Sequence, residues 1–411
     1  MIGLHITLFL SCNSPNNTSH LTQRITMRRI LIVSAYYSPH MGGVERYTEN
    51  LGKKLTELGN EVVILTSSNS ERSYGITSDN GITLIEVPSL SLMNDRFPVI
   101  KPIPSTYRIF NQIMKLSISD IIINTRYYPI CLLACRIAVK KHIRPVLIDH
   151  SSGYLSTEKS PMGYLMRLYE GLSTKIISRS KPVACAVSNR SLQWIKSLGF
   201  SPHSVIPNSI DAAAYCSSAS KRNWNSELNI SPDAFVVAYA GRLIEEKGVM
   251  KAIKAIDGIH DKNIHLIIAG SGPLNTAVSN AQNERIHFVG RLNVSDMSSL
   301  LRYASCFLMP SEYPEGMPTV LLEAAAQKCA IVVSNCAGAS DIIPESNFGT
   351  VLQDCAIDSI QKAVLVYFEN PDLLFEHSQN VHDLVCSRFT WSQTALNLCT
   401  NVLDTPSANN N

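Results

Sequence analysis

The sequence predicts an α/β protein built from two facing, doubly wound, Rossmann-like domains. Its 411 residues are enough for two or three domains. Short apolar runs alternate with helical patterns along both halves of the chain, as in parallel sheets whose strands are joined by crossover helices. The pattern starts twice, at residues 30–35 and again at 235–241, and each start is followed by a glycine-containing or basic turn. Two separate sheets are therefore expected.

The composition is that of an ordinary globular protein, with 45% hydrophobic and 17% charged residues. The net charge of +3 gives no reason to expect nucleic acid as a partner. The 11 cysteines form no Cys-x-x-Cys pair and no Cys/His cluster at zinc spacing. They are expected to be reduced, which favours a cytosolic location.

The first 26 residues do not fit the rest of the chain. Residues 2–10 are apolar, but the run is short and no Lys or Arg precedes it, whereas a secretory signal has a basic start and a longer apolar core. Residues 13–23 are polar. We expect residues 1–26 to be a disordered or non-native extension, and we find no candidate transmembrane segment.

Residues 27–209 are expected to form the first domain. The strand at 30–35 is followed by Gly42 and Gly43 and then by an amphipathic helix that ends near residue 58. Residues 88–107 hold four prolines and are expected to form an irregular loop that leads into a helix, with a solvated surface. The remaining expected strands lie at 62–66, 82–87, 120–124, 145–150 and 181–189.

Residues 210–385 are expected to form the second domain. Residues 212–229 show no apolar period and are expected to contain the hinge. A last helix, which begins near residue 389, lies within a separate segment, 386–403. The expected strands lie at 235–241, 265–270, 286–290, 306–310, 330–334 and 349–353.

The turn between the strand at 306–310 and the helix at 319–327 carries candidate chemistry. Pro318 suits the first position of that helix, and a helix N-terminus after a glycine-containing loop suits a phosphate. Glu315 and Gly316 lie on the turn, and Glu323 lies about one turn into the helix, where a carboxylate can accept hydrogen bonds from sugar hydroxyls. The alternative is a capped helix with two solvated glutamates.

Basic and histidine side chains follow the ends of other strands. Arg242 and Lys247 follow the first strand of the second domain, where doubly wound domains bind phosphates. Gly241 and Gly270 end neighbouring strands there, and His150 ends a strand of the first domain. Basic residues in an ordinary surface loop, and a histidine that merely caps its strand, are the alternatives.

Two sequence motifs that contain these residues resemble those of a known family. Glu315-Gly-Met-Pro-Thr-Val-Leu-Leu-Glu323-Ala and Ala240-Gly-Arg-Leu-x-x-x-Lys247-Gly resemble the motifs of the retaining glycosyltransferases of family 4 (glycosyl transferases group 1), which have the GT-B fold. The resemblance spans about residues 27–398.

The resemblance implies a donor site. It implies that Glu315 contacts the donor sugar and that Glu323 contacts the donor ribose. Arg242 and Lys247 would bind the pyrophosphate, and His150 would bond the sugar near the reacting carbon. The resemblance further implies that the phosphate is held by Gly316, Met317, Pro318, Thr319 and Val320. Gly42 and Gly43 would face the diphosphate and the acceptor. The last helix would return to the first domain. The resemblance also offers an alternative for residues 88–107, as a region that contacts the acceptor or a membrane.

The implied activity is retaining transfer of a sugar from a nucleoside-diphosphate donor, of the UDP or GDP type, to a saccharide or lipid-linked acceptor in cell-surface polysaccharide biosynthesis. No Asp-x-Asp motif is evident, and a fixed Arg/Lys pair would remove the need for a metal ion or other cofactor. The expected location is the cytosol, with peripheral contact to the inner face of the membrane if the acceptor is a glycolipid, although no basic amphipathic helix stands out.

The chain departs from the family pattern at three places. Ser209 replaces a usual glycine, Lys328-Cys-Ala replaces Gly-x-Pro, and Gly338-Ala-Ser-Asp341 replaces Gly-Gly-x-x-Glu. Two other functions remain open. One is a UDP-sugar 2-epimerase-like isomerase on the same fold, and the other is a non-catalytic nucleotide-sugar-binding protein.

Overall fold

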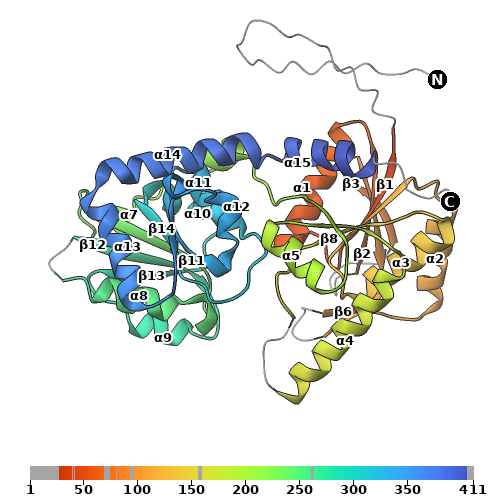
Figure 1. The fold of residues 1–411 in the computed structure, drawn as a ribbon, viewed down its shortest axis with the longest axis horizontal. Coiled ribbons are helices and arrows are strands. Elements are labelled where there is room, and N and C mark those ends of the chain that lie inside the picture. Colours follow the sequence, from red (N-terminus) through yellow and green to blue (C-terminus); the bar gives the residue numbers. More distant parts are fainter. Residues whose placement is uncertain are drawn as a thin grey trace, which may run out of the picture.

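The computed structural model describes residues 27–38, 40, 42–68, 75–79, 81–92, 97–155, 160–260 and 263–404. The extension expected at residues 1–26 lies outside these ranges. Figure 1 shows two α/β lobes side by side, one formed by the first half of the chain and one by the second. We call the part up to Ser209 the N-terminal domain and the part from Ile210 the C-terminal domain. The expected fold class, two domains with parallel sheets, is confirmed.

The N-terminal domain has an eight-stranded sheet that is parallel except for its edge strand β3, which runs antiparallel to β4. Central strands are buried throughout, as apolar parallel strands covered on both faces should be. In sheet order the strands are β10 (Pro202–Val205), β9 (Val183–Ala186), β8 (Val146–Asp149), β7 (Asp120–Asn124), β1 (Arg29–Val33), β2 (Glu61–Ser67), β4 (Ile82–Val87) and β3 (Gly75–Asp79).

The helices of this domain cover the sheet. The first begins directly after Gly42, and its buried Tyr47, Leu51 and Leu55 are four residues apart and so share one face. They are α1 (Gly43–Glu57), α2 (Pro104–Lys115), α3 (Pro129–Lys141), α4 (Pro161–Ser178) and α5 (Asn189–Ser197).

The C-terminal domain has a six-stranded, fully parallel sheet. Its strands, in sheet order, are β13 (Ile286–Gly290), β12 (Ile264–Ser271), β11 (Phe235–Arg242), β14 (Cys306–Met309), β15 (Ala330–Ser334) and β16 (Thr350–Leu352). Its helices are α6 (Ala212–Ser217), α7 (Trp224–Leu228), α8 (Val249–Asp257), α9 (Asn275–Asn280), α10 (Val294–Tyr303), α11 (Thr319–Ala326), α12 (Ala339–Ile342) and α13 (Ile357–Glu369), with short 3₁₀ turns at Glu245–Lys247, Asn335–Ala337 and Ser346–Phe348.

The end of the chain connects the two domains. Helix α14 (Pro371–Arg388) packs on the C-terminal domain, and α15 (Trp391–Leu398), followed by a π-helical turn at Cys399–Leu403, packs on α1 of the other domain (Figure 1). Trp391 meets the buried ring of Tyr47 edge-on, with 5.4 Å between the centroids. The implied return of the last helix to the first domain is therefore present in the structure.

Three local features differ from the sequence expectations. The stretch expected to be an irregular loop contains a hairpin, β5 (Ser89–Leu92) paired with β6 (Phe97–Ile100), before α2 begins. The expected hinge region contains α6 and α7, two helices too short to show a period. Ser209, where a glycine is usual, keeps a negative φ, and its hydroxyl shares a 2.7 Å hydrogen bond with that of Thr394 on α15.

Lys328 occupies a backbone conformation that favours glycine. It follows α11 with φ at 60°, and its N–H bonds Ala325 while that of Cys329 bonds Ala324, both at 3.0 Å, which is a Schellman motif. A side chain in this left-handed region costs about 1 kcal/mol. We therefore expect Lys328→Gly to raise the free energy of unfolding by roughly 0.5–1 kcal/mol and Tm by about 2–4 °C, measured by calorimetry.

Lys328→Ala is the matched control, because it removes the charge and the 3.2 Å contact to Gln379 but keeps the Cβ atom. It should bring no gain. Equal effects of the two substitutions would show that the left-handed conformation costs nothing here.

Candidate donor site

A cavity of about 430 Å³ lies between the two domains. The N-terminal domain contributes the start of α1 and the loop after β8, and the C-terminal domain contributes the end of β11 and the start of α11. Of the predicted site residues, the structure brings eleven to its wall: Gly43, His150, Gly241, Lys247, Glu315, Gly316, Met317, Pro318, Thr319, Val320 and Glu323.

Lys247 and Glu315 form an ion pair in this cavity. Lys247 ends the 3₁₀ turn after β11, and the following Gly248 fixes that turn: its φ is 74°, and an added Cβ would lie 2.2 Å from the carbonyl oxygen of Pro310. Burial, and secondarily the charge of Arg242, lowers the pKa of Lys247 to about 8. The ammonium group is therefore held in a poorly solvated place, where an anionic ligand would bind it more strongly than in water.

Helix α11 points its N-terminus into the same cavity. Pro318 is the residue that caps the helix rather than its first residue, one position off the prediction. The amides of Thr319 and Val320 precede Leu321, whose N–H makes the first intrahelical bond, to Pro318, at 3.2 Å. These two donors and the helix dipole can receive a phosphate.

Glu323 lies one turn further along α11 and reaches both domains. Its carboxylate is 3.7 Å from a guanidinium nitrogen of Arg46 on α1, and it accepts a 3.4 Å hydrogen bond from Tyr215. Burial raises its pKa, although the nearby Arg46 opposes that rise. A carboxylate so placed can accept hydrogen bonds from the vicinal hydroxyls of a ribose.

His150 is held in one tautomer. Its Nε2 lies 3.2 Å from Oδ1 of Asn124, whose amide nitrogen donates to Thr48 at 2.9 Å. Because Oδ1 can only accept, Nε2 carries the proton and Nδ1 remains an acceptor. Burial lowers the pKa of His150 to about 3, so the ring is neutral at physiological pH. It can accept from a sugar hydroxyl but is not a reservoir of protons.

The loop that carries Glu315 and Gly316 is clamped from both sides. The hydroxyl of Ser152 donates to the carbonyl of Glu315 at 2.7 Å, and the side-chain amide of Asn208 donates to Met317 at 2.6 Å. A Cβ on Gly316 would lie 2.4 Å from the carbonyl oxygen of His150. The two domains thus touch directly beside the cavity, and only a glycine permits that approach.

Three predicted residues do not line the cavity wall. Gly42 caps the N-terminus of α1. Gly270 pairs with Gly241 between β12 and β11, and a Cβ on it would lie 1.9 Å from the Gly241 carbonyl, so it has a packing role in the sheet. Arg242 is exposed, and its charge adds to the effect of burial in lowering the pKa of Lys247.

Two polar residues of the N-terminal domain that line the cavity were absent from the predicted site. Arg46 lines the cavity, and the Gly-Gly-x-Glu-Arg string around it was its only sequence signal. Asn208 also lines it, and its buried Oδ1 has no hydrogen-bond partner among the described residues. That oxygen is available to a ligand donor.

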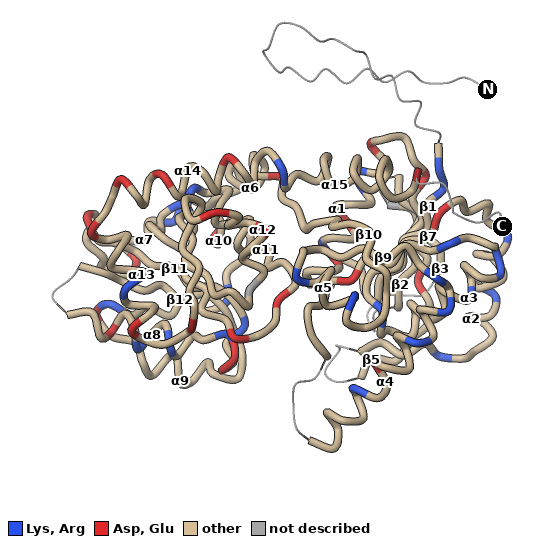
Figure 2. The backbone as a smooth tube through the Cα atoms, viewed as in Figure 1, with Lys and Arg blue, Asp and Glu red and all other residues tan. Residues whose placement is uncertain are grey.

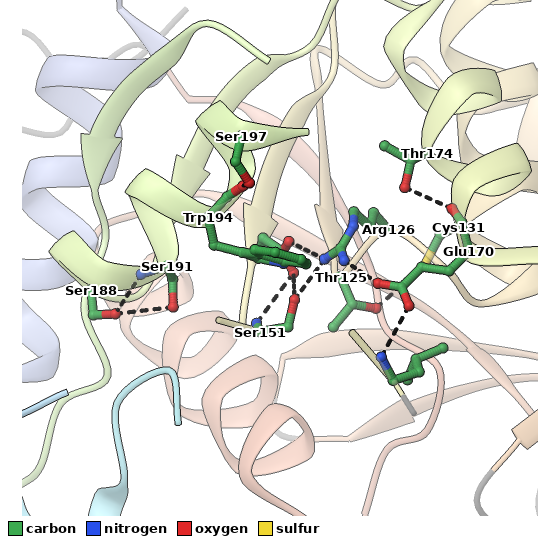
Figure 3. Close-up of polar contacts among 12 residues, drawn as sticks. Thr125, Arg126, Cys131, Ser151, Glu170, Thr174, Ser188, Ser191, Trp194 and Ser197 are labelled. Carbon is green, nitrogen blue, oxygen red and sulfur yellow. Dashed lines mark hydrogen bonds and ion pairs between the residues drawn. The ribbon is translucent and has the colours of Figure 1, made fainter. Parts of the chain in front are cut away.

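Behind the loop after β8 lies a buried ion cluster (Figure 3). Arg126 donates to Asp149 and to Glu170, and it reaches the hydroxyl of Ser151 at 2.6 Å. All three charged side chains are at most 1% exposed. Glu170 in turn accepts the amide of Leu155 at 3.0 Å. The cluster thereby holds the loop after β8 at Ser151 and at Leu155.

Within the described ranges, His, Cys, Asp and Glu side chains form no group of three or more that could hold a metal ion. The ionic partners found in the cavity are the chain's own Lys247, Arg46 and two glutamates.

Both domains match known families. Residues 41–214 match Glycosyltransferase Family 4, and residues 220–382 match Glycosyl transferases group 1. The chain is 22% identical over 384 residues to an uncharacterized glycosyltransferase of Methanocaldococcus jannaschii. The aligned region covers 89% of this chain and 96% of that protein. It is 23% identical over 402 residues to the GPI3 subunit of the Saccharomyces cerevisiae phosphatidylinositol N-acetylglucosaminyltransferase, covering 92% of this chain and 84% of that protein.

Solved structures share the fold. Sucrose-phosphate synthase from Thermosynechococcus elongatus matches with a TM-score of 0.68 and 17% identity, over 90% of this chain and 97% of that one. Anabaena Alr3699/HepE in complex with UDP matches with a TM-score of 0.68 and 15% identity, over 90% and 98%, and it has also been solved with UDP-glucose. At these identities the likeness concerns the fold alone.

Proposed function

Because the chain belongs to the GT-B glycosyltransferases, with a family 4 domain followed by a group 1 domain, we propose that it transfers a sugar from a nucleoside-diphosphate donor to a saccharide or lipid-linked acceptor. The observation that carries the proposal is the single cavity that gathers Lys247, Glu315, Glu323 and the N-terminus of α11. A uridine or guanosine diphosphate sugar is proposed as donor, and UDP is the first choice because the Anabaena protein of the same fold holds UDP and UDP-glucose.

Different residues of the cavity would bind different parts of such a donor. Glu323 would accept the ribose hydroxyls, and the α11 amides with Lys247 would take the diphosphate. Glu315 and Nδ1 of His150 would accept hydroxyls of the sugar. As the anomeric C–O bond breaks, negative charge grows on the departing diphosphate, and the fixed cations Lys247 and Arg242 would stabilise it.

We propose that the transfer retains the anomeric configuration. An inverting enzyme needs a base on the acceptor side, which is the N-terminal domain. The carboxylates at the cavity wall, Glu315 and Glu323, both come from the C-terminal domain, while Asp149 and Glu170 are bound to Arg126 away from it. This supports departure and attack on one face, with the leaving phosphate accepting the acceptor proton.

We place this transfer in the cytosol, as a step in the biosynthesis of a cell-surface polysaccharide. Free thiols support the compartment: ten cysteines in the described ranges are unpaired with one another. Diphosphate binding through Lys247 and Arg242 is proposed to need no divalent ion, so EDTA should leave nucleotide affinity unchanged.

The test is calorimetric titration with UDP, GDP and ADP. One nucleotide should bind, and Glu323→Ala and Arg242→Ala should each raise its Kd roughly tenfold or more, because each removes a charge-assisted contact. Glu376→Ala, an exposed glutamate of α14, is the matched control and should leave the Kd unchanged.

Three outcomes separate the possible activities. Release of nucleoside diphosphate that depends on an added acceptor supports transfer. Interconversion of the donor sugar without an acceptor would support the isomerase, and binding without turnover would support a non-catalytic role. If no nucleotide binds, or if both substitutions leave Kd unchanged, the site is wrongly placed.

A further inference from the structure

Helix α4 has its hydrophobic side on the outside. The residues it buries are mainly small or polar: Gly163, Glu170, Ser173, Thr174 and Ile177. Its large apolar side chains face away from the domain: Leu165, Leu168, Leu172 and Ile176 are 43–62% exposed. They are three or four residues apart and therefore form one continuous stripe along the helix. We call these four residues the α4 stripe.

More apolar surface lies around the α4 stripe. Met162 and Tyr164, in the first turn, are also exposed. Strand β6 packs on α4 through Phe97 and Tyr169, with ring centroids 5.6 Å apart, and its partner β5 turns Leu90 and Leu92 outward. Figure 1 shows α4 projecting from the N-terminal domain, with this hairpin beside its base. Together these residues form an apolar surface of the kind that marks a binding face.

The solvent-facing charges of α4 have one sign. Lys175 and Arg179, at its C-terminal end, are exposed, Arg167 is half-buried against Tyr154 and Tyr164, and the single acid of the helix, Glu170, is buried against Arg126. The whole domain shares this bias. Residues 27–209 hold 22 Lys and Arg against 12 Asp and Glu, whereas residues 210–411 hold 13 against 21. Figure 2 shows the contrast between the two lobes, which the overall charge of +3 conceals.

Two further cavities lie between the donor cavity and α4, and each shares lining residues with its neighbour. A second cavity, of about 180 Å³, shares His150, Glu315 and Gly316 with the donor cavity and extends to Tyr154. A third, of about 410 Å³, starts at Tyr154 and runs along α4 past Arg167 and Lys175. The three cavities thus follow one another from the reacting end of the donor site to the basic edge of the stripe.

We propose that the α4 stripe lies in the surface of a bilayer with anionic headgroups, and that the acceptor reaches the donor site from that bilayer as a lipid-linked molecule along these cavities. The basic residues would meet the phosphates while the leucines enter the acyl boundary, which is the arrangement of an interfacial helix. No helix in the described parts of the chain is long and apolar enough to span a bilayer. The identity of the acceptor rests on the proposed function; the membrane contact does not.

Flotation with vesicles tests the contact. The full chain should float with vesicles of mixed phosphatidylglycerol and phosphatidylcholine, bind phosphatidylcholine alone far more weakly, and dissociate as salt rises. Leu168→Glu with Leu172→Glu should lower the partition coefficient about tenfold or more. Lys175→Glu with Arg179→Glu should lower it on the anionic vesicles and leave the weak binding to phosphatidylcholine unchanged. Phe375→Glu, which places one such charge on an exposed aromatic of α14, is the control for an added surface charge and should change nothing.

Failure of either part is recognisable. If the chain floats with no vesicle, or if the leucine variant floats as well as the wild type, the proposal is overturned. It is also overturned if light scattering finds a dimer that the leucine variant dissociates, because a second copy then covers the stripe. Nucleotide titration of the same variants should be unchanged; loss of nucleotide binding in the wild type would overturn the proposed function while leaving the vesicle result to be judged by itself.

Discussion

Replacing Lys247 with Met is expected to lower the rate of sugar transfer by about 10²–10³-fold. The ammonium group lies in the cavity against Glu315, and its charge would be opposite the diphosphate as that group departs. Because the diphosphate gains charge only during bond breaking, the larger part of the loss should be in kcat. Steady-state kinetics with the donor identified by titration measures it.

Lys251→Met is the matched control. Lys251 lies four residues further along, in α8, pairs with Glu312 at 2.8 Å and is 36% exposed. Its replacement should therefore change the rate less than about twofold. If both methionine variants retain full activity, the cation that stabilises the leaving group is another residue.

The same lysine gives the binding a pH dependence. With a pKa of about 8 in the free protein, Lys247 is charged below pH 8 and loses its proton above it. A bound diphosphate holds the proton on, so affinity for the nucleotide should fall about tenfold between pH 7 and pH 9. Lys247→Arg, whose side chain stays charged, should bind with little dependence on pH over this range.

Replacing Arg126 with Leu is expected to lower the free energy of unfolding by about 3–5 kcal/mol, a large part of the 5–15 kcal/mol typical of a domain. The substitution leaves Asp149 and Glu170 buried without their partner. Burial already raises the pKa of Glu170 while Arg126 opposes the rise. Without that opposition the folded-state pKa goes higher still, so the loss of stability should grow as the pH rises from 5 to 8.

Two variants make this result interpretable. Arg136→Leu removes an exposed arginine of α3 and should change stability by less than about 0.5 kcal/mol. The triple change Arg126→Leu, Asp149→Asn and Glu170→Gln removes every charge of the cluster and should recover part of the loss and flatten its pH dependence. A single variant as stable as the wild type would mean that water reaches these carboxylates.

The parallel sheets were predictable because their strands are continuous apolar runs. Twelve expected strands correspond to strands of the structure, displaced by a few residues at most. The ones missed, β3, β5, β6 and β10, are short and contain Ser, Thr, His or Pro, so they lack the apolar run that identifies a buried strand. They lie at sheet edges or in the separate hairpin, where burial does not shape composition.

The lining of the candidate donor cavity was predictable where its residues are close in sequence. Lys247 and the string from Glu315 to Glu323 each form a local pattern. Arg46 and Asn208 reach the same cavity from the other domain, and their meeting depends on how the domains pack. The same holds for Arg126, whose partner Glu170 is 44 residues away, and for the outward stripe of α4, since the sequence shows an apolar face but not which way it turns.

Helix α15 makes completion of the N-terminal domain depend on the last part of the chain to be synthesised. The face of α1 that carries Tyr47 is completed by Trp391, and the linker residue Ile210 bonds the carbonyl of Phe389 at 2.8 Å. At about 5–20 residues per second, roughly 20–70 s separate the synthesis of Tyr47 from that of Trp391. The C-terminal domain is itself complete only when α14 ends, three residues before Trp391, so both domains are finished in the last part of synthesis. A nascent chain that stops short of Trp391 leaves the packing face of α1 open to water.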